Sequence, residues 1–201
     1  MKIWKRFLAL GLVTIITAMM FVGCGSSDIS EGVAKNDYPI TINGVTLNSQ
    51  PTGVAVLSQN IADVILTGGF EATLKAKSED CTQEDLSILP NLTIDDVQEM
   101  KNLGVTLVLV DAAPTEQQTA ALEAQGIQVL AISPAKSRDD CKRLYREVGS
   151  AMVGGNTGYT KGEKACDNVF YTLDDITRLV PSTGTQYTAC YLYDLEGHVA
   201  T

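Results

Sequence analysis

From residue 53 onward, two patterns of apolar residues alternate along the chain. Short apolar runs, typical of buried strands, are followed by stretches in which apolar residues recur every three or four positions, as in amphipathic helices. We expect strands at 53–57, 72–76, 105–110 and 127–132, with the second more exposed than the rest. We expect helices at 58–68, 94–103 and 115–125 and a longer one after Ser137. Four strands with helices between them predict an α/β fold, a parallel Rossmann-like sheet with right-handed connections.

Local signals support these boundaries. Asn43-Gly44 lies between β-forming residues and predicts a hairpin ahead of the sheet, because that turn needs positive φ at both central residues. Ser58 and Ser137 are suited to cap the helices that follow them. Residues 105–110 form a nearly unbroken apolar run, which is typical of a parallel strand covered on both faces. Residues 78–93 read as a long polar connection.

A second long helix is expected after a break at 154–156. Apolar residues keep helical spacing from about Tyr159 to Pro181, at Ala165, Val169, Leu173, Ile176 and Val180. Such a helix would be about 30 Å long, more than a connection over a small sheet requires, so it could reach from one lobe to another. Residues 186–193 then predict a new strand and 194–197 a turn.

The first 24 residues have the features of an export signal. Lys2, Lys5 and Arg6 precede an apolar run over residues 7–20, and Gly23 stands before Cys24. This arrangement predicts a signal peptide at 1–23, since the apolar run is shorter than the ~20 residues of a membrane span. The segment resembles the lipobox of bacterial lipoproteins, which implies lipid on Cys24, a flexible tether over 24–37 and attachment to the outer face of the cytoplasmic membrane. The alternative is a plain signal peptide in which Cys24 is incidental.

Charge and composition exclude several classes of function. The chain has 201 residues and a net charge of -9, and residues 1–23 carry three of its fifteen positive charges, so the remainder is near -12. That charge argues against nucleic acid as a partner. His198 is the single histidine, and no strand is followed by a phosphate-binding glycine motif, so we expect no metal, cofactor or catalytic site. An exported enzyme on a flavodoxin-like sheet remains an alternative.

Four cysteines remain beside Cys24, namely Cys81, Cys141, Cys166 and Cys190. Their spacing does not suggest zinc. They could form two disulfides in any of three pairings, or they could stay reduced as small buried hydrophobic residues. We favour free thiols, because a domain of this size has enough core to be stable without cross-links.

Polar residues follow the predicted strands at their carboxyl ends, where ligands bind in open parallel sheets. The candidate ligand contacts are Ser58, Gln59, Asn60, Ser78, Glu79, Asp80, Asp111, Ala112, Ser133 and Pro134. The alternative for Ser and Asp at these positions is that they cap the following helices.

The order of these parts resembles the substrate-binding lipoproteins of ABC importers, in the class with a rigid helical backbone that serves cobalamin, haem and iron–siderophores. The matching segments are 53–58, 66–69, 77–81, 103–110, 122–129 and 187–193. The resemblance implies a receptor without enzymatic activity that binds a metal chelate or corrinoid and delivers it to a permease and its ATPase.

That class has two α/β lobes joined by one long helix. The resemblance therefore implies an N-terminal ligand-binding lobe at 38–156, an inter-lobe helix at 157–181 and the beginning of a C-terminal lobe at 182–201. Because about twenty residues cannot bury a core, we expect either a piece of a longer protein or a truncated gene. A truncated remnant that does not transport is the alternative function.

The resemblance also implies docking on the permease through an acidic residue in the helix before the third strand. Gln98 occupies the corresponding position, and Asp96 and Glu99 flank it. The alternative is that this acidic helix face is simply solvated.

Overall fold

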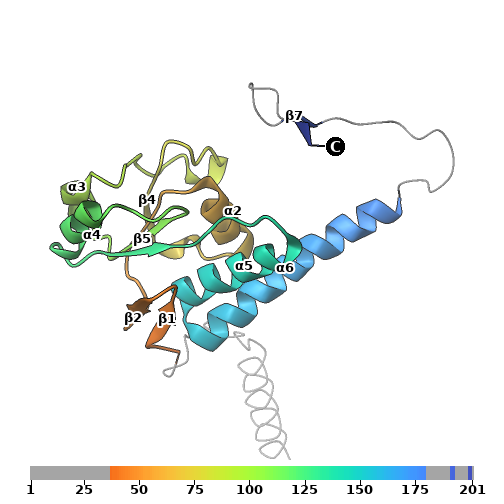
Figure 1. Cartoon of the computed structure of the whole chain (residues 1–201), viewed down its shortest axis with the longest axis horizontal. Coiled ribbons are helices and arrows are strands. Elements are labelled where there is room, and N and C mark those ends of the chain that lie inside the picture. The colour runs from red at the N-terminus through yellow and green to blue at the C-terminus, as the bar shows by residue number, and fades with distance from the viewer. Residues whose placement is uncertain (1–36, 180–190, 193–198, 201) are drawn as a thin grey trace, which may run out of the picture. The chain divides into compact units, whose positions relative to one another are not determined.

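The computed structural model describes residues 37–179, 191–192 and 199–200 (Figure 1). The predicted signal peptide, Cys24 and nearly all of the tether lie outside these residues. The described residues belong to one compact unit that begins at Asp37. Within the described ranges, no helix is both long enough and apolar enough to cross a bilayer.

Four parallel strands form the central sheet. They are β3 (Val54–Val56), β4 (Leu74–Lys77), β5 (Leu107–Val110) and β6 (Gln128–Ala131). Their order is β4-β3-β5-β6, which confirms the predicted parallel α/β sheet. The chain leaves β3 in one direction to form β4 and later returns to the other side of β3 to form β5. The β3–β5 border is therefore the switch point of the sheet, where crevices form at the carboxyl ends of the strands.

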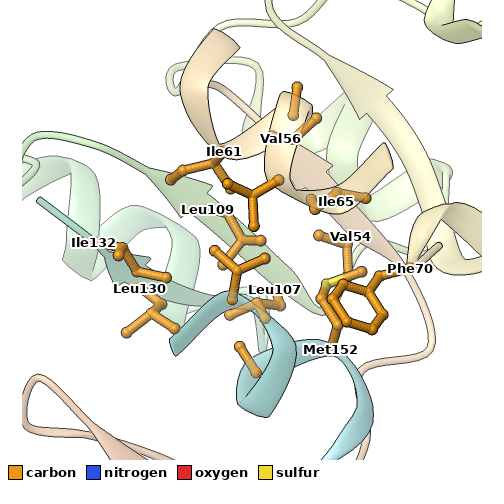
Figure 2. Packing of buried hydrophobic residues seen from close by; sticks show 14 of the residues in the cluster. Val54, Val56, Ile61, Ile65, Phe70, Leu107, Leu109, Leu130, Ile132 and Met152 are labelled. Carbon is orange, nitrogen blue, oxygen red and sulfur yellow. The ribbon is translucent and has the colours of Figure 1, made fainter. Parts of the chain in front are cut away.

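Helices cover both faces of the sheet. One face packs against α2 (Gln59–Gly68) and α5 (Arg138–Val153), and the other against α3 (Val97–Asn102) and α4 (Glu116–Glu123). Side chains alternate along β5, with Leu107 and Leu109 in the first core cluster and Val108 and Val110 in the second. Figure 2 shows the first cluster, in which strand side chains meet those of α2 and Met152 of α5. Each fully buried side chain of this size contributes roughly 1.5–3 kcal/mol.

The predicted helix caps are confirmed. Ser58 accepts a hydrogen bond from the Ile61 N–H, and Ser137 caps α5 in the same way. Gly69 ends α2 in the left-handed conformation. Thr115 and Gln118 exchange hydrogen bonds in a capping box at the start of α4.

Three predicted elements differ in the structure. The second strand begins at Leu74, two residues later than predicted, after a 3₁₀ turn at Glu71–Thr73. Ala72 and Lys75 are exposed, so the segment 72–76 is more exposed than the other predicted strands, as expected. The helix expected over 94–103 is confined to α3. The connection 78–93 is not uniformly polar, since Cys81, Leu86 and Leu92 are buried and Asn91 bridges to Lys77 alongside β4. Tertiary packing, not local periodicity, decides these boundaries.

The predicted hairpin is present as β1 (Ile40–Ile42) and β2 (Val45–Leu47), and Asn43 and Gly44 both have positive φ. It is anchored to the rest of the domain by side chains. The Asn43 amide donates to the Ala131 carbonyl at 3.0 Å and to Glu147 at 3.2 Å. The Tyr38 hydroxyl donates to the Ala151 carbonyl at 3.3 Å, and burial followed by the Asp37 charge raises the pKa of Tyr38 to about 12.

The second long helix, α6 (Gly155–Arg178), has 24 residues and a length of about 36 Å. It begins four residues earlier than predicted, because only Gly154, at φ 111°, breaks the chain after α5. Asp37 holds its start, since the Gly155 N–H donates to the Asp37 carbonyl at 2.8 Å and the Asn156 N–H to its carboxylate at 3.2 Å.

The first half of α6 packs against α5 at backbone contact (Figure 1). Gly158 and Gly162 are buried there, and a Cβ on either would lie about 2 Å from a backbone carbonyl of α5. Salt bridges flank the contact, pairing Arg146 with Glu163, Lys142 with Asp167 and Arg138 with Asp174.

The C-terminal half of α6 stays linked to α5 through the salt bridge between Asp174 and Arg138. Its side chains become exposed, as shown by Tyr171 at 68%, Ile176 at 55% and Leu179 at 81%. The helix packs on α5 and α2, and its last turns extend beyond them (Figure 1). Beyond α6, β7 (Tyr191–Leu192) pairs antiparallel with β8 (Val199–Ala200). The remainder of the strand predicted at 186–193, and the predicted turn at 194–197, lie outside the described residues.

Candidate ligand-binding site

A pocket of about 460 Å³ lies at the carboxyl ends of β3, β4 and β5. This volume falls within the range of sites that bind small molecules. The pocket is lined by Leu57, Ser78, Glu79, Asp80, Leu92, Thr93, Ile94, Val110, Asp111, Ala112, Ala113, Pro114 and Gln118. It therefore spans the switch point at which ligands bind in this kind of sheet.

Half of the predicted ligand contacts meet in this pocket. Ser78, Glu79 and Asp80 come from the end of β4, and Asp111 and Ala112 from the end of β5. Glu79, Asp80 and Ala112 are exposed, and Asp111 is half-buried. The parallel register that aligns β3 with both neighbours brings these two strand ends to the same edge.

The other predicted contacts stand outside the lining. Ser58 is 3% exposed, and its hydroxyl donates to Asp111 Oδ2 at 2.9 Å while it caps α2. Ser58 thus ties the end of β3 to the end of β5 and positions the Asp111 carboxylate. Gln59 and Asn60 are exposed in the first turn of α2. Ser133 and Pro134 are exposed beyond β6, where the Ser133 carbonyl accepts a hydrogen bond from Arg143.

Sequence reasoning missed one wall of the pocket, Leu92–Ile94. The Leu92 N–H donates to the Lys77 carbonyl at 2.7 Å and the Lys77 N–H to the Pro90 carbonyl at 3.0 Å, so this segment runs beside β4 like a further short strand. Lys77 is a buried residue, and its ammonium group donates to the Asn91 side chain at 2.7 Å. The alternation of Leu92, Thr93 and Ile94 was the available signal for this wall.

The lining combines apolar surface with negative charge. Apolar contacts come from Leu57, Leu92, Ile94 and Val110, and carboxylates come from Glu79, Asp80 and Asp111. In the part of the chain that the structure describes, no lysine or arginine lines the pocket. Among the described residues that line the pocket there is also no histidine, cysteine, methionine or tyrosine, the side chains that usually hold haem iron. Within the described part of the chain, no group of three or more acidic, histidine or cysteine side chains is placed to hold a bare metal ion. The pocket is suited to contact a bulky small molecule through apolar surface and hydrogen-bond acceptors.

The predicted docking residues lie on and beside α3. Asp96 is the residue before the helix, and hydrogen bonds from Thr93 lower the pKa of its carboxyl group, so it is ionised at neutral pH. Gln98 and Glu99 are exposed, and the Gln98 amide donates to Asn102 at 3.1 Å. Thr93 also lines the pocket, so this acidic surface adjoins the candidate site.

Comparison with known proteins gives matches only among solved structures. No protein-family model and no curated protein matches the chain. A possible iron-binding periplasmic solute-binding protein from Staphylococcus epidermidis ATCC 12228 is similar, with a TM-score of 0.54 and 14% identity over 69% of this chain and 55% of that one. The haem-binding protein HmuT matches with a TM-score of 0.54 and 17% identity over 69% of this chain and 47% of that one. A periplasmic haem-binding protein from Pseudomonas aeruginosa matches with a TM-score of 0.53 and 13% identity over 64% and 46%.

These identities are low, and the shared property is the fold. The described part of the chain has the fold of these periplasmic binding proteins, which confirms at that level the resemblance drawn from the order of the elements. The chain spans about half the length of the structures it matches.

Proposed function

We propose that this chain forms the ligand-binding N-terminal lobe and backbone helix of an ABC-importer receptor, which binds a metal chelate or corrinoid and delivers it to a permease. The observation that carries the proposal is the open pocket at the switch point, on a fold whose solved neighbours are periplasmic proteins that bind haem or are described as iron-binding. Because those neighbours are binding proteins and not enzymes, they support a role without catalysis.

The charge of the lining narrows the class of ligand. Glu79, Asp80 and Asp111 make this edge negative, and an anionic group placed against them would lose its hydration without gaining a partner. A neutral corrinoid or a cationic ferric chelate fits the pocket better than a ligand that directs carboxylates at this lobe. Haem would have to bind with its propionates directed away from the carboxylates of this lobe.

Calorimetric titration and thermal shift can test this on the full chain. The probes are cyanocobalamin, a cationic ferric trihydroxamate and haem. The test variant is Glu79→Gln/Asp80→Asn, and the matched control is Glu84→Gln/Asp85→Asn in the 3₁₀ turn outside the lining. Loss of charge-assisted hydrogen bonds should weaken a bound probe by roughly tenfold or more in the test variant alone. No binding of any probe, or equal effects of the two variants, would remove the support for this site.

The same proposal places the permease contact on the acidic α3 surface of Asp96, Gln98 and Glu99. If a carboxylate of this surface pairs with a permease arginine, reversing its charge should weaken the binding of the chain to the permease. In a Cys24→Ser background without the lipid, Glu99→Lys should lower co-flotation of the chain with vesicles containing the permease, and the effect should weaken as salt screens the pair. Glu123→Lys on exposed α4 is the control for net charge. Equal behaviour of the two variants would indicate a merely solvated face.

The lipid anchor belongs to the proposal as well. An exported receptor held by lipid on Cys24 should be found in the membrane fraction, and Cys24→Ser should release it to the soluble fraction. If the variant stays with the membrane, another part of the chain holds it there.

A further inference from the structure

The antiparallel packing of α5 and α6 has a regular register. Gly149 faces Gly158, and a Cβ on Gly149 would lie 2.2 Å from the Gly158 carbonyl oxygen. One turn along, the Tyr145 carbonyl faces Gly162, at 2.1 Å from the position of a Cβ there. Each step moves four residues back along α5 and four residues forward along α6, as expected for neighbours on facing helix surfaces.

The next step of this register pairs Cys141 with Cys166. The adjacent salt bridge between Lys142 and Asp167, at 2.7 Å, shows that the register continues through this turn. Cys166 is fully buried and Cys141 is half-buried, and both belong to the same core cluster. In the structure Cys81, Cys141 and Cys166 are free thiols, and Cys81 lies elsewhere, against Ser78 and the Val56 carbonyl.

We propose that Cys141 and Cys166 are a disulfide site that cross-links α5 to α6 when the protein meets a disulfide-bearing oxidant. A disulfide needs Cα atoms about 4.4–6.8 Å apart, and the Cys141 side chain lies close enough to Cys166 to interact with its thiol. The bond would close a loop that contains the end of α5, Gly154 and the start of α6. It would thereby hold the first half of α6 against the domain, whereas the last turns of α6 extend beyond the bond.

The half-buried Cys141 should react with the oxidant before the fully buried Cys166 does. The Cys141 thiolate attacks one sulfur of the oxidant, forming a mixed disulfide and releasing the first thiolate of the oxidant. The Cys166 sulfur then attacks Cys141 Sγ and releases the second thiolate, which takes up the Cys166 proton. Two protein thiols are thereby oxidised by two electrons, and the oxidant disulfide is reduced to two thiols. Burial, together with the neighbouring Cys141, raises the pKa of Cys166 to about 12, so little of Cys166 is thiolate at neutral pH and it does not attack the external oxidant. It reacts second, once the mixed disulfide on Cys141 lies beside it.

The test uses the native full chain and oxidised glutathione as the probe. After exposure, remaining thiols are alkylated in denaturant, and the unreduced digest is analysed by mass spectrometry. We expect a peptide that joins Cys141 to Cys166 and is two hydrogen masses lighter than its reduced halves. Pairing of either cysteine with Cys81 or Cys190, or alkylation of both in full, would overturn the proposal.

Thermal unfolding supplies the second measurement. Because a cross-link restricts the unfolded chain, oxidation should raise Tm by about 5 °C or more. Cys141→Ser, at the half-buried position, should fold and show no such shift, and Cys81→Ser is the matched control that keeps it. A shift that persists in Cys141→Ser would show that other cysteines carry the effect. These outcomes do not depend on whether the chain binds a ligand.

Discussion

Replacing Gly158 with alanine would place a methyl group inside the contact between α5 and α6. The new Cβ would lie 2.0 Å from the Gly149 carbonyl oxygen, 2.5 Å from its carbon and 2.8 Å from Ser150 Cα. All three are backbone atoms, so no side-chain rotation can relieve the overlap. Since ordinary contact begins near 3.4 Å, the two helices would have to separate by about 1.4 Å at this point.

The magnitude follows from two opposing contributions. Overpacking of a tight contact costs about 1–3 kcal/mol, and an overlap with rigid backbone belongs at the upper end. Alanine returns about 1 kcal/mol through its better helix propensity. The free energy of unfolding should therefore fall by about 2 kcal/mol, which corresponds to a loss of roughly 4–8 °C in Tm for a domain of this size.

Urea unfolding followed by helical circular dichroism measures this directly. Gly158→Ala should lower the midpoint with little change in slope, and Gly162→Ala should behave similarly because its Cβ would lie 2.1 Å from the Tyr145 carbonyl oxygen. Thr160→Ala, on the exposed face of the same helix, is the control and should change stability by no more than about 0.5 kcal/mol. A Gly158→Ala protein as stable as this control would refute backbone contact between α5 and α6.

Other substitutions test the remaining parts of the domain. Thr115→Ala removes the side-chain cap of α4 and should lower the free energy of unfolding by about 1 kcal/mol, as measured by urea titration. An unchanged free energy of unfolding would show that this cap does not stabilise α4. Ser58→Ala removes both a helix cap and the hydrogen bond to Asp111, so its loss should be larger, near 2 kcal/mol, and a smaller loss would argue against the link between the two strands. The hydrogen bond and charge of Arg138 lower the pKa of Asp174 below its ordinary 3.8, so this pair stabilises the fold at neutral pH and loses its effect as the pH falls below that value. Tm measured against pH should therefore be flatter on the acid side in Asp174→Asn, and an unchanged acid limb would contradict this.

Several elements could be predicted from sequence because one local cause decides them. Asn43-Gly44 has the backbone freedom that its turn demands, and Ser58 supplies an acceptor for the first orphan N–H groups of α2. The unbroken apolar run at 105–110 contains a strand with cores on both faces. In the first two cases the interacting groups lie within a few residues of each other in the sequence. In the third case the side chains of the strand need only be buried, whatever their neighbours are.

The predictions from sequence were wrong where contacts between residues far apart in the chain decide the local structure. Gly154-Gly155-Asn156 suggested a break, whereas α6 already begins at Gly155 because Asp37 receives its first N–H groups. Gly158 and Gly162 are poor helix formers in isolation, and they stand inside α6 because only a glycine fits against the α5 backbone. The strand expected over 72–76 begins only at Leu74, where pairing with Val54 of β3 starts, and residues 71–73 form a 3₁₀ turn.

The candidate site shows the same division. Parallel strands direct their carboxyl ends to one edge, so Ser78, Glu79, Asp80 and Asp111 could be named from strand positions and do meet in the pocket. Only the structure shows that Ser58 donates a hydrogen bond to Asp111 and that Leu92–Ile94 form a wall of the pocket. Both contacts depend on which strands become neighbours in the sheet. Periodicity and turn chemistry act over a few residues and therefore give the order of strands and helices. Sheet order and the depth of helix contact depend on atoms far apart in the chain, and these decide which side chains line the pocket and where α6 leaves the domain.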